Sequence, residues 1–521
     1  MFTEMFKIFI GGAVALSSCG AAAGAPGPAE IAAQVEAIRV ASGVSSAALL
    51  LVEGEQVVLD RTFGVTDWAS GRPVDAESRY KVGSISKVFT GIALLKAEAR
   101  GLLRLDQPLN ELLAVPPYTN PWEKTRPLTT AMLLEHTAGW YDMSRAEFDS
   151  RDPQPLTLAE ALALSPVSRQ SHWPPGMYAE YSNSGLGVAA YVLEQVSGER
   201  FENFIDREVF RPLGMASATL LLDAPTRAHL VQGYDRDGKT PIPYWHIVYR
   251  PAGGLNLRPR DMAPFLSMLL AHGRHDGRPY LSPAQVRRLE TPTTTLAAKS
   301  GLDYGYGLGI YAAQHHGHTL YTHGGDGDGY LARFAYSPAA GRGYFIVITA
   351  FNHAPLNAMT DLAADWLVAP LPPVPEPPPA AIPPATLELW RGWYRSASVR
   401  FPRPGWDQRR LKIGSADGLL YTQQENGRRR RLIPVTAHHF RRAGQTTATI
   451  ALLELEDGSR VLQTPDGNWL APPRRLSSAL SEGADQRPGA DRDKTAAGDD
   501  AEPARVEPGA EPASGEHAER R

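Results

Sequence analysis

A proline-rich segment divides this chain of 521 residues and sets the first limit on its fold. The segment, APLPPVPEPPPAAIPP at residues 369–384, has nine prolines in sixteen residues. Because proline lacks a backbone N–H group and fixes φ, such a run favours an extended, semi-rigid spacer. The chain is also too long for one ordinary hydrophobic core. We therefore predict two folded units joined by a linker at residues 369–385.

The chain has the composition of a globular protein, and the unit before the linker mixes helix and strand patterns, as expected of the α+β class. The whole chain is 43% hydrophobic and 21% charged, with a net charge of −3. This balance gives no electrostatic reason to expect nucleic acid as a partner. Residues 30–368 alternate patterns typical of helices with patterns typical of strands. They predict one large domain.

The unit after the linker, at residues 386–475, predicts a small antiparallel β domain. Its short apolar runs are separated by four dipeptides that suit tight hairpin turns: Asp417-Gly418, Asn426-Gly427, Asp457-Gly458 and Asp466-Gly467. The tail at residues 478–521 has too few apolar side chains to offset the cost of ordering, so we expect it to be disordered.

The first 23 residues resemble an export signal. Lys7 precedes an apolar stretch at residues 8–16, which small residues follow. Leu16-Ser17-Ser18-Cys19 also resembles a bacterial lipobox, which would make Cys19 a lipidation site; ordinary cleavage near residues 21–23 is the alternative. We expect a periplasmic or cell-envelope lipoprotein, or else a secreted protein. Cys19 is the only cysteine, so no intramolecular disulfide is expected.

The stretch SISK, from Ser84 to Lys87, opens a segment whose apolar residues recur at helical spacing. Ser84 then lies in the first turn, where free N–H groups favour a developing anion. Lys87 lies on the same helix face, and a lysine with a lowered pKa can activate a serine hydroxyl. Taken alone, most such motifs are a serine helix cap followed by an exposed lysine.

Two later motifs add candidate partners. Tyr181 and Asn183 lie in a polar turn before a predicted helix, where a phenol can relay protons and an amide can orient a lysine. An ordinary turn is the alternative interpretation. His323-Gly324-Gly325 ends a predicted strand, and its glycines would let a substrate lie along the strand edge.

In this order, SISK, YSN and HGG resemble the S-x-x-K, Y-x-N and H-x-G motifs of the serine β-lactamase and penicillin-binding protein superfamily. The resemblance is greatest to the branch with class C β-lactamases, esterases and D-aminopeptidases. MLLEHTAGW, VFRPLGM and YGYGLGI also look like family landmarks. The resemblance implies a β-lactamase/transpeptidase-like fold: an antiparallel sheet flanked by helices, plus a helical subdomain. It also implies a serine hydrolase that needs no cofactor.

The resemblance further implies a role for each motif residue. Ser84 would attack a carbonyl and form an acyl-enzyme with a small molecule or peptide. Lys87 and Tyr181 would share the proton transfers, and Asn183 would orient them. His323 would lie near the leaving group.

The strand edge beside the nucleophile departs from the family pattern. The resemblance places the oxyanion hole at the N–H groups of Ser84 and Asp326, with Gly325 as a further substrate-binding position. Asp326 and Asp328 stand where many members have a hydroxyl residue and a proline. Since β-lactams and D-Ala-D-Ala peptides present a carboxylate here, two acids should repel them. We expect an ester, amide or small peptide substrate. A β-lactamase, a D-Ala-D-Ala carboxypeptidase and a penicillin-binding sensor without turnover are the alternatives.

A histidine-rich stretch offers a rival interpretation as a metal site. Six side chains there are of metal-binding types: His315, His316, His318, His323, Asp326 and Asp328. No H-E-x-x-H motif occurs, so we predict a surface histidine cluster and no catalytic metal. His136, in LLEHTAG, is expected to hold a turn near the active site.

Overall fold

The computed structural model describes residues 26–473 except residues 151, 153 and 426. The expected export signal, Cys19 and the tail predicted to be disordered lie outside the described residues. Within the described part, no helix is both long enough and apolar enough to span a membrane.

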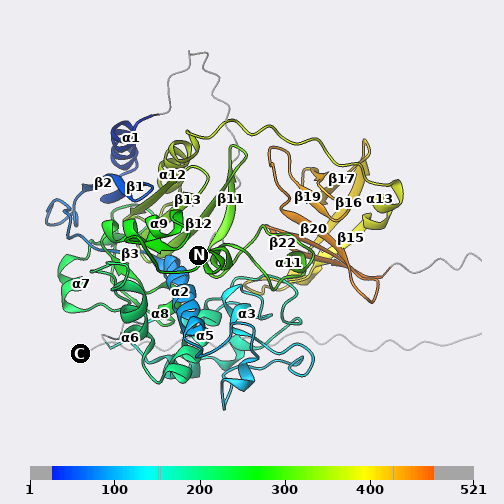
Figure 1. Ribbon diagram of the computed structural model, residues 1–521, viewed down its shortest axis with the longest axis horizontal. Coiled ribbons are helices and arrows are strands. Elements are labelled where there is room, and N and C mark those ends of the chain that lie inside the picture. Colours follow the sequence, from blue (N-terminus) through cyan, green and yellow to red (C-terminus); the bar gives the residue numbers. More distant parts are fainter. Residues whose placement is uncertain (1–25, 151, 153, 426, 474–521) are drawn as a thin grey trace, which may run out of the picture. The chain divides into compact units, whose positions relative to one another are not determined.

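A six-stranded antiparallel sheet forms the centre of the large domain (Figure 1). Its order is β11-β12-β13-β14-β1-β2, so the first strands of the chain pair with the last strands of the domain. The strands are β1 (Ser46–Glu53), β2 (Gln56–Gly64), β11 (Tyr311–His315), β12 (His318–Gly327), β13 (Tyr330–Ser337) and β14 (Arg342–Ile348). Seven of the eight residues of β1 are buried, because helices cover both faces of the sheet.

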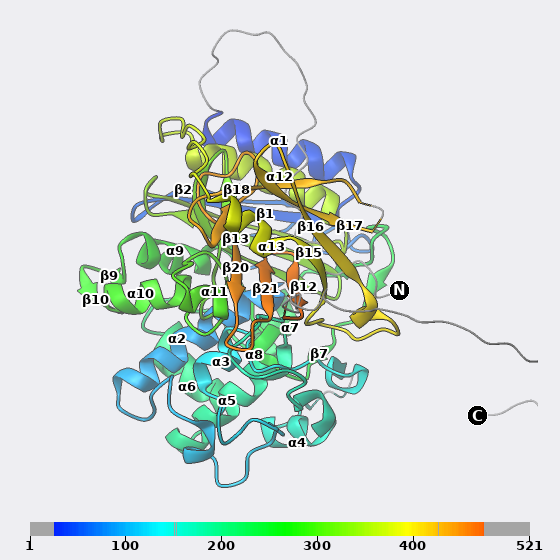
Figure 2. The same cartoon turned by 90° about the vertical axis from the view of Figure 1, so that its right-hand side faces the viewer.

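Two helices, α1 (Pro28–Ala41) and α12 (His353–Val368), cover one face of the sheet (Figure 2). Packed against the other face are α9 (Met262–Leu270) and α2 (Ser86–Ala99). The two faces belong to separate apolar cores. Side chains from alternate positions of a strand therefore enter different environments.

The helical subdomain surrounds α2, which is buried along most of its length. Its other helices are α3 (Thr130–Leu134), α4 (Leu158–Ala163), α5 (Asn183–Ser197), α6 (Phe201–Ile205) and α8 (Arg250–Gly253). A 3₁₀ turn, Gly83–Ile85, precedes α2. Ser84 thus lies just ahead of the α-helix and not within its first turn, where the sequence had placed it.

Shorter elements complete the large domain. The helices are α7 (Ala224–His229), α10 (Pro283–Glu290) and α11 (Leu296–Lys299). The two-residue strand pairs are β3 (Tyr80–Lys81) with β8 (Asn256–Leu257), β4 (Asp149–Ser150) with β7 (His246–Ile247), β5 (Gly233–Tyr234) with β6 (Pro241–Ile242), and β9 (Arg274–His275) with β10 (Arg278–Pro279).

Residues 372–383 form neither helix nor strand, and α13 (Pro384–Trp390) follows them. The C-terminal unit is a closed antiparallel barrel of eight strands, drawn in yellow to orange in Figure 1. Its strands are β15 (Gly392–Ser396), β16 (Arg410–Ala416), β17 (Leu419–Gln424), β18 (Arg430–Pro434), β19 (His439–Arg441), β20 (Ile450–Glu454), β21 (Arg460–Thr464) and β22 (Gly467–Ala471). The predicted fold class is confirmed.

Candidate active site

Ser84 lies where the 3₁₀ turn meets the edge of β12. Gly83 has φ +54°, and a Cβ atom on it would lie 2.6 Å from the Asp326 carbonyl oxygen. A Cβ atom on Gly325 would lie 1.8 Å from the Val82 carbonyl oxygen. Only glycines allow this close approach, which brings the backbone of β12 beside Ser84.

The Lys87 side chain is fully buried beneath Ser84. Its Nζ lies 2.9 Å from Ser84 Oγ and donates to Asn183 Oδ1 at 2.7 Å and to the Ala252 carbonyl oxygen at 2.6 Å. Burial lowers the pKa of Lys87 well below its ordinary value. A neutral amine has two N–H groups and one lone pair. Because two pure acceptors engage both N–H groups, the lone pair is left for the Ser84 hydroxyl.

Tyr181 completes the immediate surroundings of this pair. Its ring centre lies 4.8 Å from Lys87 Nζ. Burial raises the pKa of Tyr181, and a hydrogen bond with the Ser84 side chain offsets only part of that rise. Tyr181 therefore keeps its O–H group, which is what a proton relay requires. Of the two side chains, Lys87 is the one whose pKa is lowered.

Asn183, the first residue of α5, connects Lys87 to a buried ion pair. Its Nδ2 donates to the two carboxylate oxygens of Asp142 at 3.2 and 3.0 Å. Arg400 Nε donates to Asp142 Oδ2 at 2.7 Å. The Asp142 side chain is fully buried, and Arg400 is 12% exposed. Since Arg400 lies between β15 and β16, the barrel contributes a charge to the network around the nucleophile.

This ion pair leads to a prediction for Arg400→Gln. Burial has the largest effect on the pKa of Lys87 and lowers it. The charge of Asp142 opposes this effect, and the charge of Arg400 adds to it. Without Arg400, the uncompensated carboxylate should hold Lys87 protonated to higher pH. The acidic limb of kcat/KM should then move to higher pH, and kcat/KM at pH 7 should fall about tenfold. A pH–rate profile measures this shift.

Arg410→Gln, which removes an exposed arginine of the same barrel, is the matched control and should leave the profile unchanged. An unshifted profile in Arg400→Gln would show that the ion pair does not set the protonation of Lys87.

His136 packs directly against Tyr181, with ring centres 4.2 Å apart. Its Nδ1 accepts from the Ser182 N–H at 3.2 Å, and its carbonyl oxygen accepts from the Glu180 N–H at 2.8 Å. Burial and the nearby Lys87 lower the pKa of His136 well below its ordinary value. His136 therefore holds the turn, as expected, and also positions the Tyr181 ring.

His323 is neutral and engages both of its ring nitrogens. Nδ1 lies 2.5 Å from the Gly324 carbonyl oxygen, which can only accept, so Nδ1 donates. Nε2 then accepts from the Tyr306 hydroxyl at 2.7 Å. Burial, together with Lys87, lowers the pKa of His323 to about 3. The His323 side chain therefore carries no positive charge.

The two aspartates after His323 each have a basic side chain nearby. Asp326 lies on the opposite face of β12 from His323, and its carboxylate is 3.4 Å from His353 at the start of α12. Burial lowers the pKa of Lys81, and the charge of Asp328 opposes this, so Asp328 also has a cation nearby. The predicted repulsion of an anionic substrate by these acids is therefore weaker than expected.

Glu180, next to Tyr181, joins the site to the barrel. It is largely buried, and its carboxylate accepts from Ser398 Oγ at 2.7 Å. Burial raises the pKa of Glu180 to about 7. The folded state thus favours the protonated acid. Protonated Glu180 stabilises the folded state fully below its ordinary pKa near 4.5, and this contribution is lost as the pH rises through about 7. The free energy of unfolding then falls by up to about 3 kcal/mol.

We expect Glu180→Gln to flatten the dependence of the melting temperature on pH between 5 and 8, compared with the original chain. Glu55→Gln, at an exposed glutamate between β1 and β2, should leave that dependence unchanged. If the melting temperature depended on pH equally in the original chain and in Glu180→Gln, the raised pKa could not be assigned to Glu180. Thermal melts over this pH range provide the measurement.

A serine beside a buried lysine, under an antiparallel sheet with helices on both faces, defines the class of protein as a serine hydrolase. The chain belongs to the β-lactamase family, whose model matches residues 31–366. It is 27% identical to a β-lactamase of Yersinia enterocolitica over 39% of this chain and 50% of that one. It is 26% identical to a D-aminopeptidase of Cereibacter sphaeroides over 61% of this chain and 58% of that one.

Among solved structures, the octameric penicillin-binding protein homologue from Pyrococcus abyssi has the same fold. The two superpose with a TM-score of 0.56 at 19% identity, over 85% of this chain and 99% of that one. At such identity the likeness concerns the fold alone. The chain spans only about half of the length of the Yersinia relative, so its substrate must be argued from its own site.

Sequence reasoning missed three residues of this site. Asp142 and Arg400 carry no motif signal, and they meet across 258 positions of sequence. Tyr306, which hydrogen-bonds His323, lies in YGYGLGI. This segment resembles a family landmark, so the sequence could have pointed to Tyr306. The structure brings together Ser84, Lys87, Tyr181, Asn183, His323, Gly325 and the backbone of Asp326.

Proposed function

We propose that this protein hydrolyses esters, amides or small peptides through an acyl-enzyme on Ser84. The observation that carries the proposal is the buried Lys87 amine, whose Nζ lies 2.9 Å from Ser84 Oγ and whose pKa burial lowers well below its ordinary value. Ser84 Oγ attacks the substrate carbonyl carbon while Lys87 Nζ takes the hydroxyl proton. The N–H groups of Ser84 and Asp326 stabilise the resulting oxyanion.

The second half of the reaction returns the proton. The bond to the leaving group breaks, and the proton on Lys87 passes through the Tyr181 hydroxyl to that group. A water molecule then attacks the acyl carbon as the same base takes its proton. The acid product leaves, and Ser84 regains its hydrogen. Asn183 holds the Lys87 amine in place throughout, and Gly325 keeps the strand edge open to the substrate.

The neutral state of His323 favours substrates without a carboxylate at this strand. Many relatives place a lysine here, and β-lactams and D-Ala-D-Ala peptides present a carboxylate to it. His323 supplies no charge, and its two nitrogens already have partners. The preference therefore follows from the uncharged His323 side chain and not from repulsion by Asp326 and Asp328. An esterase or D-aminopeptidase-like activity fits best, ahead of a β-lactamase or carboxypeptidase.

A substrate panel with one charge-restoring variant tests this preference. We expect kcat/KM for a p-nitrophenyl ester or a D-amino acid amide to exceed that for nitrocefin. His323→Lys should raise the nitrocefin-to-ester ratio by about tenfold or more, because a cation then meets the carboxylate. His318→Lys adds the same charge at the start of β12 and should not change the ratio. A clear preference of the original chain for nitrocefin would reverse the proposal.

A further inference from the structure

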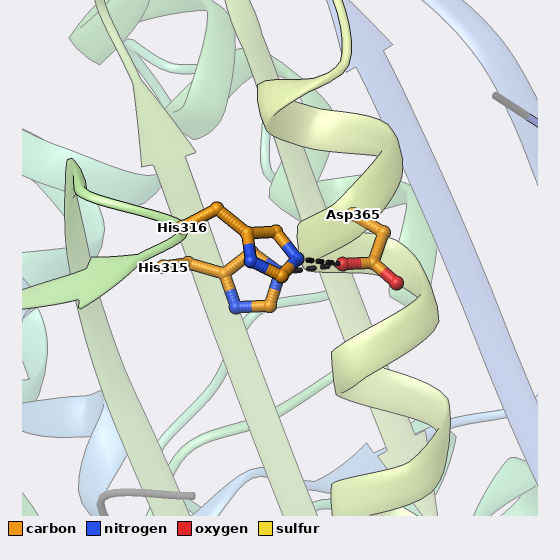
Figure 3. Close-up of side chains that lie close together, drawn as sticks. All are labelled: His315, His316 and Asp365. Atoms are coloured by element: carbon orange, nitrogen blue, oxygen red, sulfur yellow. Dashed lines mark hydrogen bonds and ion pairs between the residues drawn. The ribbon is translucent and has the colours of Figure 1, made fainter. Parts of the chain in front are cut away.

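His315, His316 and Asp365 form a cluster outside the site around Ser84. Figure 3 shows the imidazoles of His315, the last residue of β11, and His316, in the β11–β12 turn, facing the Asp365 carboxylate on α12. Nε2 of His315 and Nε2 of His316 lie 2.7 and 2.9 Å from the same oxygen, Asp365 Oδ1. One ligand atom from each residue lies within 4.8 Å of the other two. The three donors therefore converge on one point.

The backbone of the turn is what brings the two histidines together. Neighbouring residues of a regular strand point to opposite faces, so two adjacent imidazoles would diverge. His316 instead has φ +48° and Gly317 has φ +82°, the left-handed pair of a two-residue hairpin turn. Asparagine or glycine adopts this conformation more readily than histidine. Thr446 of the barrel donates to the Gly317 carbonyl oxygen at 2.6 Å and fixes the turn.

The cluster is open to solvent and carries negative charge on the helix side. Side-chain exposure is 21% for His315, 69% for His316 and 47% for Asp365, which leaves room for a water ligand. Asp361, one turn earlier on α12, interacts electrostatically with His315 and Asp365, and Arg333 offsets part of its charge. Two imidazoles, a carboxylate and water are a set that Zn²⁺ accepts, whereas Mg²⁺ and Ca²⁺ prefer oxygen ligands.

We propose that His315, His316 and Asp365 bind one divalent transition-metal ion of the zinc class. The ion would tie the edge strand β11 to α12 and so stabilise the sheet. It would not take part in the chemistry at Ser84. His318, which pairs with His315 across the hairpin, is five positions from His323 along β12, about 17 Å at the rise of a strand. Among the described residues, His323, Asp326 and Asp328 belong to no comparable group of ligands.

Calorimetric titration of the untagged full chain with ZnCl₂ tests the site. We expect one ion per chain, no comparable binding of Mg²⁺, and a melting temperature that rises with Zn²⁺ and returns with a chelator. His316→Asn suits the turn yet removes a ligand, and Asp365→Asn preserves size. Each should weaken Zn²⁺ binding at least about tenfold.

The chain provides a matched control in His438 and His439, a second adjacent pair, in the barrel. There, His439 Nε2 bonds Ser300 Oγ and not a carboxylate. The double variant His438→Ala, His439→Ala should retain the Zn²⁺ affinity of the original chain. The proposal would be overturned if the original chain bound no Zn²⁺, or if His316→Asn and Asp365→Asn bound Zn²⁺ as tightly as the original chain does. The three residues would then be an ion-paired surface cluster. Loss of binding in the control variant alone would also overturn it, by moving the site to the barrel.

Discussion

Ser84→Ala is expected to lower turnover of the best ester substrate by about 10⁴-fold or more and to abolish labelling by a fluorophosphonate probe. Ser84 Oγ is the hydroxyl that faces the lone pair of Lys87, at 2.9 Å. The substitution removes the atom that bonds to the acyl group. The residual rate would come from the oxyanion donors and substrate positioning alone.

Ser182→Ala is the matched control for this prediction. Ser182 directly precedes α5, and its hydroxyl bonds the Tyr141 carbonyl oxygen and the Ser184 hydroxyl. This variant should remain labelled and active. Full labelling of Ser84→Ala would refute the assignment of the nucleophile.

Lys87→Met is expected to lower kcat/KM by about 10²–10⁴-fold, the usual contribution of a positioned base. Methionine fills a similar buried volume but has no lone pair to take the Ser84 proton. In the original chain, burial holds the pKa of Lys87 well below its ordinary value. Its kcat/KM should therefore rise with pH through that lowered pKa and stay level above it. The variant should lose this limb of the pH–rate profile.

Lys96→Met, on the same helix, controls for the loss of a lysine. Lys96 is the last basic residue of α2, and its ring partner is Tyr280. This variant should keep both turnover and the shape of the profile. Retention of more than about a tenth of kcat/KM in Lys87→Met would show that another group is the base.

Local sequence patterns predicted the parts of the site that lie within a single secondary-structure element. The three-residue spacing of Ser84 and Lys87 placed both on one helix face, and the structure finds them in contact. The Asp-Gly dipeptides likewise predicted the barrel hairpins, with φ +51° at Asp417 and +74° at Gly418. Closure of the barrel was not predicted, because pairing of β15 with β22 joins segments far apart in sequence.

Long-range contacts were beyond prediction for the same reason. Arg400 reaches Asp142 across 258 positions, and Asp365 reaches His315 across 50. The direction of the Asp326 side chain could not be predicted, because motif spacing gives the order of residues along a strand but not the face on which each side chain lies. Its side chain lies on the α12 face, beside His353.

The most direct test of the central claim is peptide mapping of a trapped acyl-enzyme. The protein is mixed with a slowly deacylated ester, quenched in acid, digested and analysed by mass spectrometry. We predict one acyl adduct per chain, on the peptide that carries Ser84, formed rapidly in the original chain and slowly in Lys87→Met. An adduct on any other residue, or product formation without an adduct at Ser84, would contradict the account.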